Sequence, residues 1–432
     1  MQMTKLVARL VAIVGGMMIL MRRWGAETAA PAIGTAPEIP KAKPQSIPTL
    51  KMPTAQGWAP GHVPVAAPGL KVNAFASGLD HPRWMEVLPN GDVLVAEAMF
   101  VPGGIQTAFD YAMYATMKRA DAVGHSANRI TLLRDANGDG VAETQEIFLS
   151  GLNQPFGMTL LGDKLYVANT DALLVYPFQP GPTKLTATPT KLASFKPGGH
   201  WTRSLLPNHD GSKIYIGVGS DTNIADKGME AEAGRACIYE YTPETGELRS
   251  FAEGLRNPVG MAWEPATGAL WTVVNERDGL GDETPPDYLT SVQDGAFYGW
   301  PFSYWDRIVD DRVPQDPVRV AASVTPDYAL GGHTASLGLC WMPAGTLPGF
   351  PGGMVIGQHG SWNRSKLSGY KVIFVPFVGG KPAGPSRDIL SGFLAADEKT
   401  SYGRPVGCTL GPDGSLLVAD DVGNVIWRVT GA

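Results

Sequence analysis

One short pattern recurs six times along this chain, and it constrains the fold more than any other feature. Each copy opens on a Gly-Leu-x-x-Pro turn or a variant of it, continues through an apolar stretch and a Gly/Asp turn, and ends in a short β-rich stretch. The copies occupy residues 78–98, 151–170, 201–221, 254–276, 333–360 and 403–421. A repeat of this kind indicates stacked supersecondary units rather than an irregular globular fold.

Each copy predicts two strands joined by a turn such as NGD or PDGS, and further strand-like segments, among them NRITLLR and VIWRVT, lie between the copies. Two strands per copy and an outer pair make a four-stranded blade. The sequence therefore predicts an all-β fold, a six-bladed β-propeller with four-stranded blades. A generic β-sandwich would use similar turns, but it does not explain the recurrence. A short helical insertion is expected at residues 109–122, where the spacing is helical.

The N-terminus differs from the repeats. An apolar run at residues 10–21 is flanked by basic residues and is shorter than the roughly 20 residues of a membrane span. Residues 1–24 are predicted to be a signal peptide, or an uncleaved anchor that tethers the protein to the membrane, and the expected location is the periplasm. Residues 25–68 are rich in Pro and Ala and read as an extended linker, so the propeller is expected over residues 69–432.

Composition and charge exclude several classes. The 53 Gly and 36 Pro residues suit a turn-rich β domain, and a net charge of −6 gives no basic surface for nucleic acid. The three cysteines form no C-x-x-C motif and no C-x-x-C-H haem-attachment site. If electrons leave one at a time through a haem, that haem belongs to another protein.

Arginines recur beside the repeated turns, where the inner strands of a propeller converge on the mouth of its channel. They are Arg83, Arg203, Arg256, Arg364 and Arg404, of which Arg364 instead follows a strand end. Any one of them alone would be an ordinary solvated side chain. Converging guanidinium groups repel one another unless an anion holds them together, so the set favours a planar, multiply anionic ligand.

His200 is the best candidate for a catalytic base. It follows a Pro-Gly-Gly turn and lies three residues before Arg203, and a neutral imidazole can accept the proton released when an alcohol or hemiacetal is oxidised. A structural histidine is an equally open reading at this point. His333 and His359 are weaker candidates.

Two acidic segments could hold a metal. Residues 275–283 (NERDGLGDE) combine carboxylates with glycines, so side chains and backbone carbonyls could wrap a hard cation. Residues 135–146 (DANGDGVAETQE) match the EF-hand loop formally. Strand signals flank this second segment where helices would be required, so a hairpin loop is the favoured interpretation and a structural calcium the alternative.

With these residues assembled, the chain resembles the pyrroloquinoline quinone (PQQ)-dependent glucose/sorbosone dehydrogenases, and it is most similar to the sorbosone branch. The segments that carry the resemblance are GLRNPVGMAW, NERDGLGDETPPDYLTSVQDGAFYGWP, GQHGSWNRSKLSGYKV and RPVGCTLGPDGSLLVADD. The likeness extends over roughly residues 70–430. It implies a six-bladed propeller with PQQ across the channel mouth, in agreement with the six copies.

The resemblance also implies roles for particular residues. His200 would be the base, and Arg256, followed by Asn257, would contact the quinone oxygens and stabilise the developing negative charge. Calcium would polarise the quinone carbonyl, held by the loop that contains Asp278, Gly279 and Asp282, mainly through backbone carbonyls. The other cofactor contacts that the resemblance implies are Arg83, Arg364 and Arg404. Arg203, His333 and Trp362 are assigned to the cofactor only by their position near the mouth. The glucose enzymes carry Gly-Pro where this chain has Asp278-Gly279, which puts the calcium ligand set in doubt.

The expected substrate is a sugar or a sugar-derived aldehyde, with a quinone or a cytochrome as external electron acceptor. Two other functions remain open. A calcium-dependent propeller lactonase would place acidic residues around the mouth with fewer arginines, and a non-catalytic binding propeller would leave the arginines and His200 without a task. A nicotinamide enzyme is disfavoured, because no G-x-G-x-x-G follows a strand and opens a helix.

Overall fold

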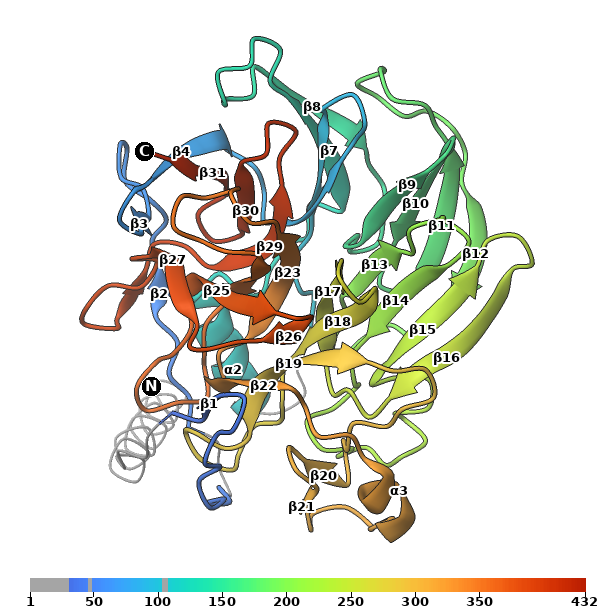
Figure 1. Cartoon of the computed structure of the whole chain (residues 1–432), viewed down its shortest axis with the longest axis vertical. Helices are drawn as coiled ribbons and strands as arrows, with labels where there is room; N and C mark the ends of the chain where they lie inside the picture. The colour runs from blue at the N-terminus through green and yellow to red at the C-terminus, as the bar shows by residue number, and fades with distance from the viewer. Residues whose placement is uncertain (1–30, 46–48, 103–107) are drawn as a thin grey trace, which may run out of the picture.

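The computed structural model describes residues 31–45, 49–102 and 108–432, and in them six antiparallel sheets form the blades of a propeller (Figure 1). Blades one to three comprise β5 (Pro82–Val87), β6 (Val93–Glu97), β7 (Arg129–Arg134) and β8 (Thr144–Leu149); β9 (Met158–Leu161), β10 (Lys164–Ala168), β11 (Ala172–Pro177) and β12 (Thr190–Ser194); and β13 (Arg203–Pro207), β14 (Ile214–Val218), β15 (Cys237–Thr242) and β16 (Glu247–Glu253).

The remaining blades follow the same order of strands. They comprise β17 (Pro258–Glu264), β18 (Ala269–Val274), β19 (Pro286–Val292) and β22 (Tyr328–Gly332); β23 (Ser336–Met342), β24 (Gly353–Gln358), β25 (Lys371–Val378) and β27 (Arg387–Ser391), with β26 (Lys381–Pro382) beside β25; and β29 (Pro405–Leu410), β30 (Leu416–Asp420), β31 (Val425–Gly431) and β4 (Leu70–Ser77). Each sequence copy supplies the first two strands of one blade, so the predicted six-bladed propeller is confirmed.

The ring closes in the sixth blade, where the first strand of the propeller domain pairs with the last. Strand β4 pairs with β31 in a register that runs from Leu70 opposite Gly431 to Ser77 opposite Val425, and Figure 1 shows the blue strand beside the red one. A strand from the start of the domain therefore completes the last sheet. This pairing ties the start of the domain to its end and so holds the ring closed.

Apolar side chains fill the interfaces between neighbouring blades. In β24, Met354 and Ile356 pack with Trp271 of blade four, whereas Val355 between them packs toward Trp427 of blade six. Side chains alternate across a strand, so a strand buried on both faces needs apolar residues at every position. This explains why the strand segments read as continuous apolar runs.

Glycines on the inner strands let adjacent blades approach closely. A side-chain carbon added to Gly260 on β17 would lie 2.6 Å from the backbone nitrogen of Leu339 on β23. Equivalent close approaches occur at Gly157, Gly338 and Gly407. The repeated glycine in VGMA, FGMT, LGLC and VGCT is therefore a packing requirement of the inner ring.

Two helices are present in the described residues, and both lie outside the blades. Helix α2 (Ala108–Arg119) confirms the predicted helical insertion. Helix α3 (Pro317–Ala322) was not predicted; it belongs to an insertion between β19 and β22 that also holds the hairpin of β20 (Ser303–Tyr304) and β21 (Ile308–Val309). Asp316 caps α3 by accepting bonds from the amides of Val318 and Arg319.

The segment predicted to be a linker is instead packed against the propeller. Its described residues form three short strands: β1 (Ile33–Gly34) adds to β22, β2 (Thr54–Ala55) pairs with β28 (Thr400–Ser401), and β3 (Val65–Ala66) adds to β27. The linker interpretation of residues 25–68 is therefore wrong for residues 31–45 and 49–68, because contacts of two residues at a time leave no periodicity in the sequence. The predicted signal peptide at residues 1–24 lies outside the described residues.

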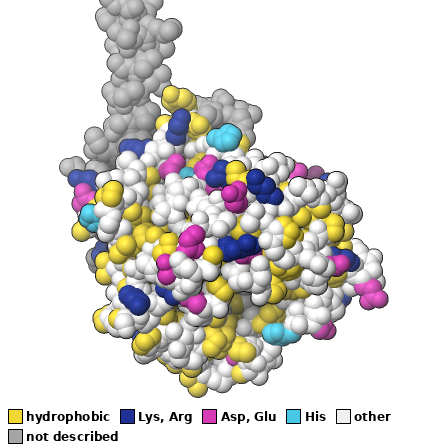
Figure 2. All heavy atoms as spheres, turned by 90° about the horizontal axis from the view of Figure 1, so that it is seen from above, with side chains coloured by type: hydrophobic (Ala, Val, Ile, Leu, Met, Phe, Trp, Pro, Cys, Tyr) yellow, Lys and Arg dark blue, Asp and Glu magenta, His cyan; other side chains and the backbone are white. Residues whose placement is uncertain are grey.

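The described part of the chain holds no helix long and apolar enough to cross a membrane. On the face shown in Figure 2, basic and acidic side chains lie in small mixed groups among neutral and apolar ones. This mixture accords with the modest net charge of −6.

Candidate active site

The site residues meet because of strand direction. Within each blade the first strand begins, and the second strand ends, on the same face of the ring, which we call the mouth face. Residues just before β13, β17 and β29 and just after β14, β18 and β24 therefore lie on it. The arginines, histidines and loop residues expected to form a site lie at the start of a first strand, just before one, or in the segment that follows a second strand. Hundreds of residues separate some of them.

His200 is held in one tautomer by Ser220, which follows β14. The imidazole Nδ1 lies 2.9 Å from the carbonyl oxygen of Ser220 and 3.1 Å from its hydroxyl. A carbonyl only accepts, so Nδ1 carries the hydrogen and Nε2 keeps its lone pair. Burial, reinforced by the charge of Arg256, lowers the pKa of His200 to about 3. The ring is therefore neutral at ordinary pH and presents a proton acceptor.

Two buried arginines support the His200 loop from behind. Arg203 is completely buried and donates to the carbonyls of Lys196, Thr202 and His200. Arg235, which the sequence reasoning missed, donates to five carbonyls, those of Lys196, Gly198, His200, Gly219 and Ser220. Arg203 thus has no surface to offer a ligand. Both guanidinium groups instead fix the backbone that carries the base.

Arg256 and Asn257 border the same histidine. Arg256 donates to the backbone and side-chain oxygens of Asn223 and to the carbonyls of Asn275 and Glu276, at 2.8–3.2 Å. The Asn257 side-chain oxygen is buried and has no hydrogen-bond partner within the described residues. A side chain at Gly219 would overlap both Asn257 and His200, so these two residues are close neighbours. An unsatisfied buried oxygen at this point indicates a missing donor.

A second polar group gathers Arg83, His359, Arg404 and Asp421. The Asp421 carboxylate forms a buried ion pair with Arg83 and lies 2.9 Å from Nε2 of His359. Burial opposes its ionisation, but His359 and Arg83 hold the pKa of Asp421 well below its usual range. Arg404 donates to the carbonyls of His359 and Gly360, both at 2.9 Å. Burial, together with Arg404, lowers the pKa of His359 to about 3.

The two groups adjoin one another. The guanidinium carbon of Arg83 is 5.4 Å from the ring centre of Trp201, the residue that follows His200. Trp201 in turn stacks edge-on against Phe156, and Phe156 against Trp84, with ring centres 6.0 and 4.8 Å apart. An aromatic bridge therefore links the base to the arginine group.

Carboxylates and backbone carbonyls of the protein already bind most of these arginine side chains. Asp421 neutralises Arg83, and Arg364 pairs with Glu283 and donates to the carbonyls of Asp282 and Gly332. An anionic ligand is therefore not needed to hold the cations together. Donors that are not sealed inside the protein remain for one nonetheless: within the described residues, Arg83 Nη2 and Arg404 Nη1 have no hydrogen-bond partner.

The oxygen atoms of the loop expected to bind calcium already accept hydrogen bonds from the protein. The Asp278 carbonyl accepts from Arg277 Nε and Nη2 and from Asn223 Nδ2, at 2.7–3.1 Å, which exceeds its two lone pairs. The Gly279 carbonyl accepts from the amide of Gln45 at 2.9 Å. The Asp282 carboxylate accepts from the amide and hydroxyl of Ser365.

The side-chain carboxylate of Asp278 is in contact with a histidine, His333. His333 Nδ1 lies 3.2 Å from an Asp278 carboxylate oxygen and Nε2 lies 2.8 Å from the carbonyl of Gly281. Both neighbours are acceptors, so the ring is an imidazolium. Despite burial, Asp278 raises the pKa of His333. With this cation in contact and Arg256 3.8 Å from the same carboxylate, the donor set does not fit calcium. Trp362, half-buried, lies on the facing loop.

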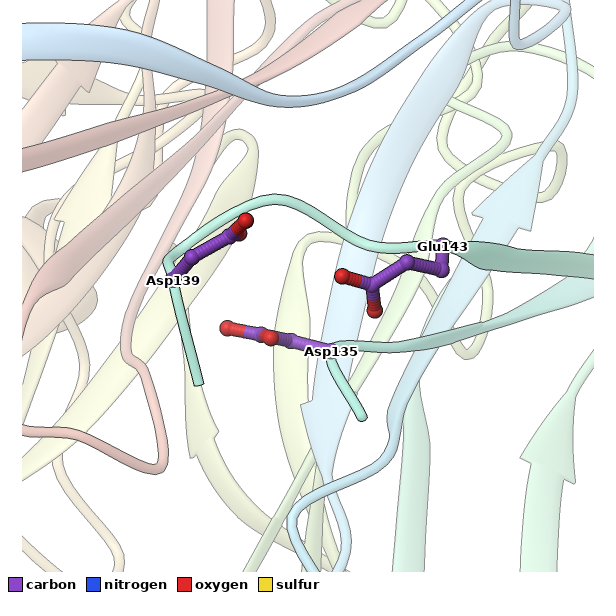
Figure 3. A group of neighbouring side chains, drawn as sticks. All are labelled: Asp135, Asp139 and Glu143. Carbon is purple, nitrogen blue, oxygen red and sulfur yellow. The ribbon is translucent and has the colours of Figure 1, made fainter. Parts of the chain in front are cut away.

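The second acidic segment lies between β7 and β8, on the face opposite the mouth, and is the predicted hairpin loop. Figure 3 shows Asp135, Asp139 and Glu143 at its tip, with oxygen atoms within 4.8 Å of one another. These carboxylates accept bonds from the loop's own amides, including those of Gly138 and Ala136. No other group of three metal-ligating side chains is this close within residues 31–45, 49–102 and 108–432.

The fold and the mouth face define a class: a six-bladed propeller with a neutral, oriented histidine beside partly satisfied arginines. The sequence model of the TrAA12-like family matches residues 64–285 and 309–432. The chain belongs to this family.

Curated proteins and solved structures are also similar to this chain. A PQQ-dependent pyranose dehydrogenase of Coprinopsis cinerea is 24% identical over 424 residues, covering 84% of this chain and 54% of the relative, so the chain spans about half of that protein's length. An uncharacterized protein of Borreliella burgdorferi is 27% identical over 292 residues, covering 64% of this chain and 76% of that protein.

Among solved structures, the Trichoderma reesei family AA12 protein superimposes with a TM-score of 0.70 at 19% identity, covering 85% of this chain and 98% of that one. The PQQ domain of the C. cinerea pyranose dehydrogenase superimposes with a TM-score of 0.68 at 20% identity, covering 88% and 100%. At these identities the likeness shows a shared fold.

Proposed function

We propose that this protein is a PQQ-dependent dehydrogenase that oxidises a sugar at the mouth face of its propeller. The observation that carries the proposal is the orientation of His200, whose Nδ1 donates to Ser220 so that Nε2 keeps its lone pair, in a ring that neighbours Asn257 and senses the charge of Arg256. Family membership supports the same function, because relatives are named as PQQ-dependent pyranose and sugar dehydrogenases.

The residues present fit PQQ, a planar quinone with several carboxylates. Arg83 and Arg404 retain guanidinium donors that no described residue uses, and such donors bind carboxylates strongly. When bound, PQQ would supply the two-electron acceptor that the oxidation needs. Arg256 would lie where negative charge develops, and its bonds to Asn223 and Glu276 hold it there before the reaction begins.

The protein's own part in the chemistry is proton transfer. Oxidation of a hydroxyl-bearing carbon breaks an O–H and a C–H bond, and His200 Nε2 takes the proton of the first while the hydride leaves from the second. Ser220 stabilises the resulting imidazolium through Nδ1. The low pKa of His200 makes it a weak base without a ligand, and an anionic cofactor beside Arg256 would raise that pKa toward neutrality.

Several finer points belong to the proposal. The substrate is an aldose or a sorbosone-type aldehyde, the electrons pass to an external quinone or cytochrome, and the protein works in the periplasm, where the N-terminal segment delivers or tethers it. Calcium is the expected component that the loop geometry supports least, although a relative's structure is described as a calcium structure.

The test begins with PQQ binding, which is measured by absorbance titration of purified protein with and without calcium. Reconstituted protein is then assayed for dye reduction with a panel of aldoses and sugar aldehydes. His200→Ala should lower turnover by about 10²–10⁴-fold. The control is His209→Ala, an exposed histidine in a hairpin on the other face. Absence of PQQ binding in both conditions would overturn the proposal.

A further inference from the structure

An N-terminal strap lies across the loop that resemblance assigns to calcium. We define the strap as residues 43–45 and 49–51. The amide of Lys43 donates to the carbonyl of Leu280 at 2.8 Å, and the amide of Gln45 donates to that of Gly279 at 2.9 Å. Strap amides therefore hold two consecutive carbonyls of the loop.

The strap also holds the facing loop of blade five. The amide of Lys51 donates to the carbonyl of Trp362 at 2.9 Å. Asn363, almost fully buried, accepts from the Gly279 amide at 3.2 Å and donates to the carbonyl of Thr49 at 2.8 Å. One asparagine thus connects the strap to both loops, and the three segments form a single hydrogen-bonded unit.

The strap lies outside the part of the chain that matches the family model, because that match begins at residue 64. Its effect on the loop is the effect that a bound cation would have. A metal orders a loop by gathering carbonyl oxygens, and here amide groups occupy Gly279 and Leu280 while Arg277 and Asn223 saturate Asp278.

We propose that the strap replaces calcium as the element that orders loop 278–281, so that PQQ binds this protein without calcium. The inference rests on the proposed function. Arg256 and Arg277 place positive charge beside the loop, which further opposes a divalent cation. The strap residues are positioning residues, since they act through the loop rather than on the cofactor.

The experiment uses the full-length protein stripped of metal with EDTA. PQQ is titrated by absorbance in EDTA and in excess calcium, and the wild-type dissociation constants should agree within about threefold. Gln45→Pro removes the amide donor and should weaken PQQ binding about tenfold or more in EDTA, with partial recovery in calcium because the Gly279 carbonyl is freed. Gln45→Ala keeps the amide and loses only the side-chain bonds to Thr49, so it should weaken PQQ binding in EDTA much less than Gln45→Pro does.

Hydrogen exchange without PQQ provides a second measurement. Gln45→Pro and Asn363→Leu should both speed exchange in peptides covering residues 276–283 and 360–366, whereas Gln45→Ala should not. Unchanged exchange in both variants overturns the role of the strap. Wild-type binding that requires calcium overturns the replacement of the metal while the proposed function stands. No PQQ binding by the wild type in either condition overturns both.

Discussion

The Arg83–Asp421 pair offers a test that separates a structural role from a cofactor-binding role. Arg83→Met keeps most of the apolar stem of the side chain but removes its charge, leaving the Asp421 carboxylate buried beside a His359 ring that is neutral at ordinary pH. One Asp421 oxygen already lacks a hydrogen-bond partner within the described residues. Breaking a buried pair from one side costs about 3–5 kcal/mol of stability, and the variant should lose that much.

The double variant Arg83→Met/Asp421→Asn removes the stranded charge. It should recover most of the lost stability, so that the two substitutions couple by about 2–3 kcal/mol in a double-mutant cycle measured by urea unfolding. PQQ affinity should stay reduced about tenfold or more in the double variant, because the guanidinium that would contact a cofactor carboxylate is still absent. PQQ affinity that returns to the wild-type value together with stability would show that Arg83 only supports the fold.

Three further predictions concern the inner glycines, the loop that carries His200, and His359. Gly260→Ala should destabilise the protein by about 1–3 kcal/mol, because its added carbon would press on the Leu339 amide. Gly352→Ala should cost far less, because the nearest neighbour of its added carbon would be the Trp341 ring at 3.3 Å. Equal unfolding midpoints for the two variants would contradict this packing effect. Arg235→Lys should lower turnover through a higher barrier while PQQ affinity stays within about threefold, since it loosens only the His200 loop; an equal loss of PQQ affinity would place it in the binding site instead.

The third prediction concerns acid. Because the folded pKa of His359 is about 3 and its ordinary value 6.5, the unfolded chain binds its proton first as pH falls, and stability is lost in that window by about 1.4 kcal/mol per pH unit. His359→Gln should therefore flatten the difference in unfolding free energy between pH 6.5 and 4 relative to the wild type. An unchanged pH slope would mean that His359 is protonated in the native state.

The sequence by itself determined the blades. Strands buried between neighbours must be apolar at every position, hairpin turns are local, and the inner glycines answer a contact repeated around the ring, so all three leave a periodic trace. It also brought His200, Arg256, Arg83 and Arg404 to one face, because their places in the repeat are equivalent. The shared fold and the family then followed from features visible in the chain.

Only the tertiary structure decided which arginines could meet a ligand. Arg203 and Arg235 look no different from Arg404 in the sequence, yet the first two donate to carbonyls behind the base. Within the described residues, Arg404 keeps its Nη1 donor without a partner. The same holds for the strap, where Gln45 meets Gly279 through backbone atoms alone. A backbone amide is common to every residue except proline, so a contact of this kind selects no side chain and leaves no pattern to read.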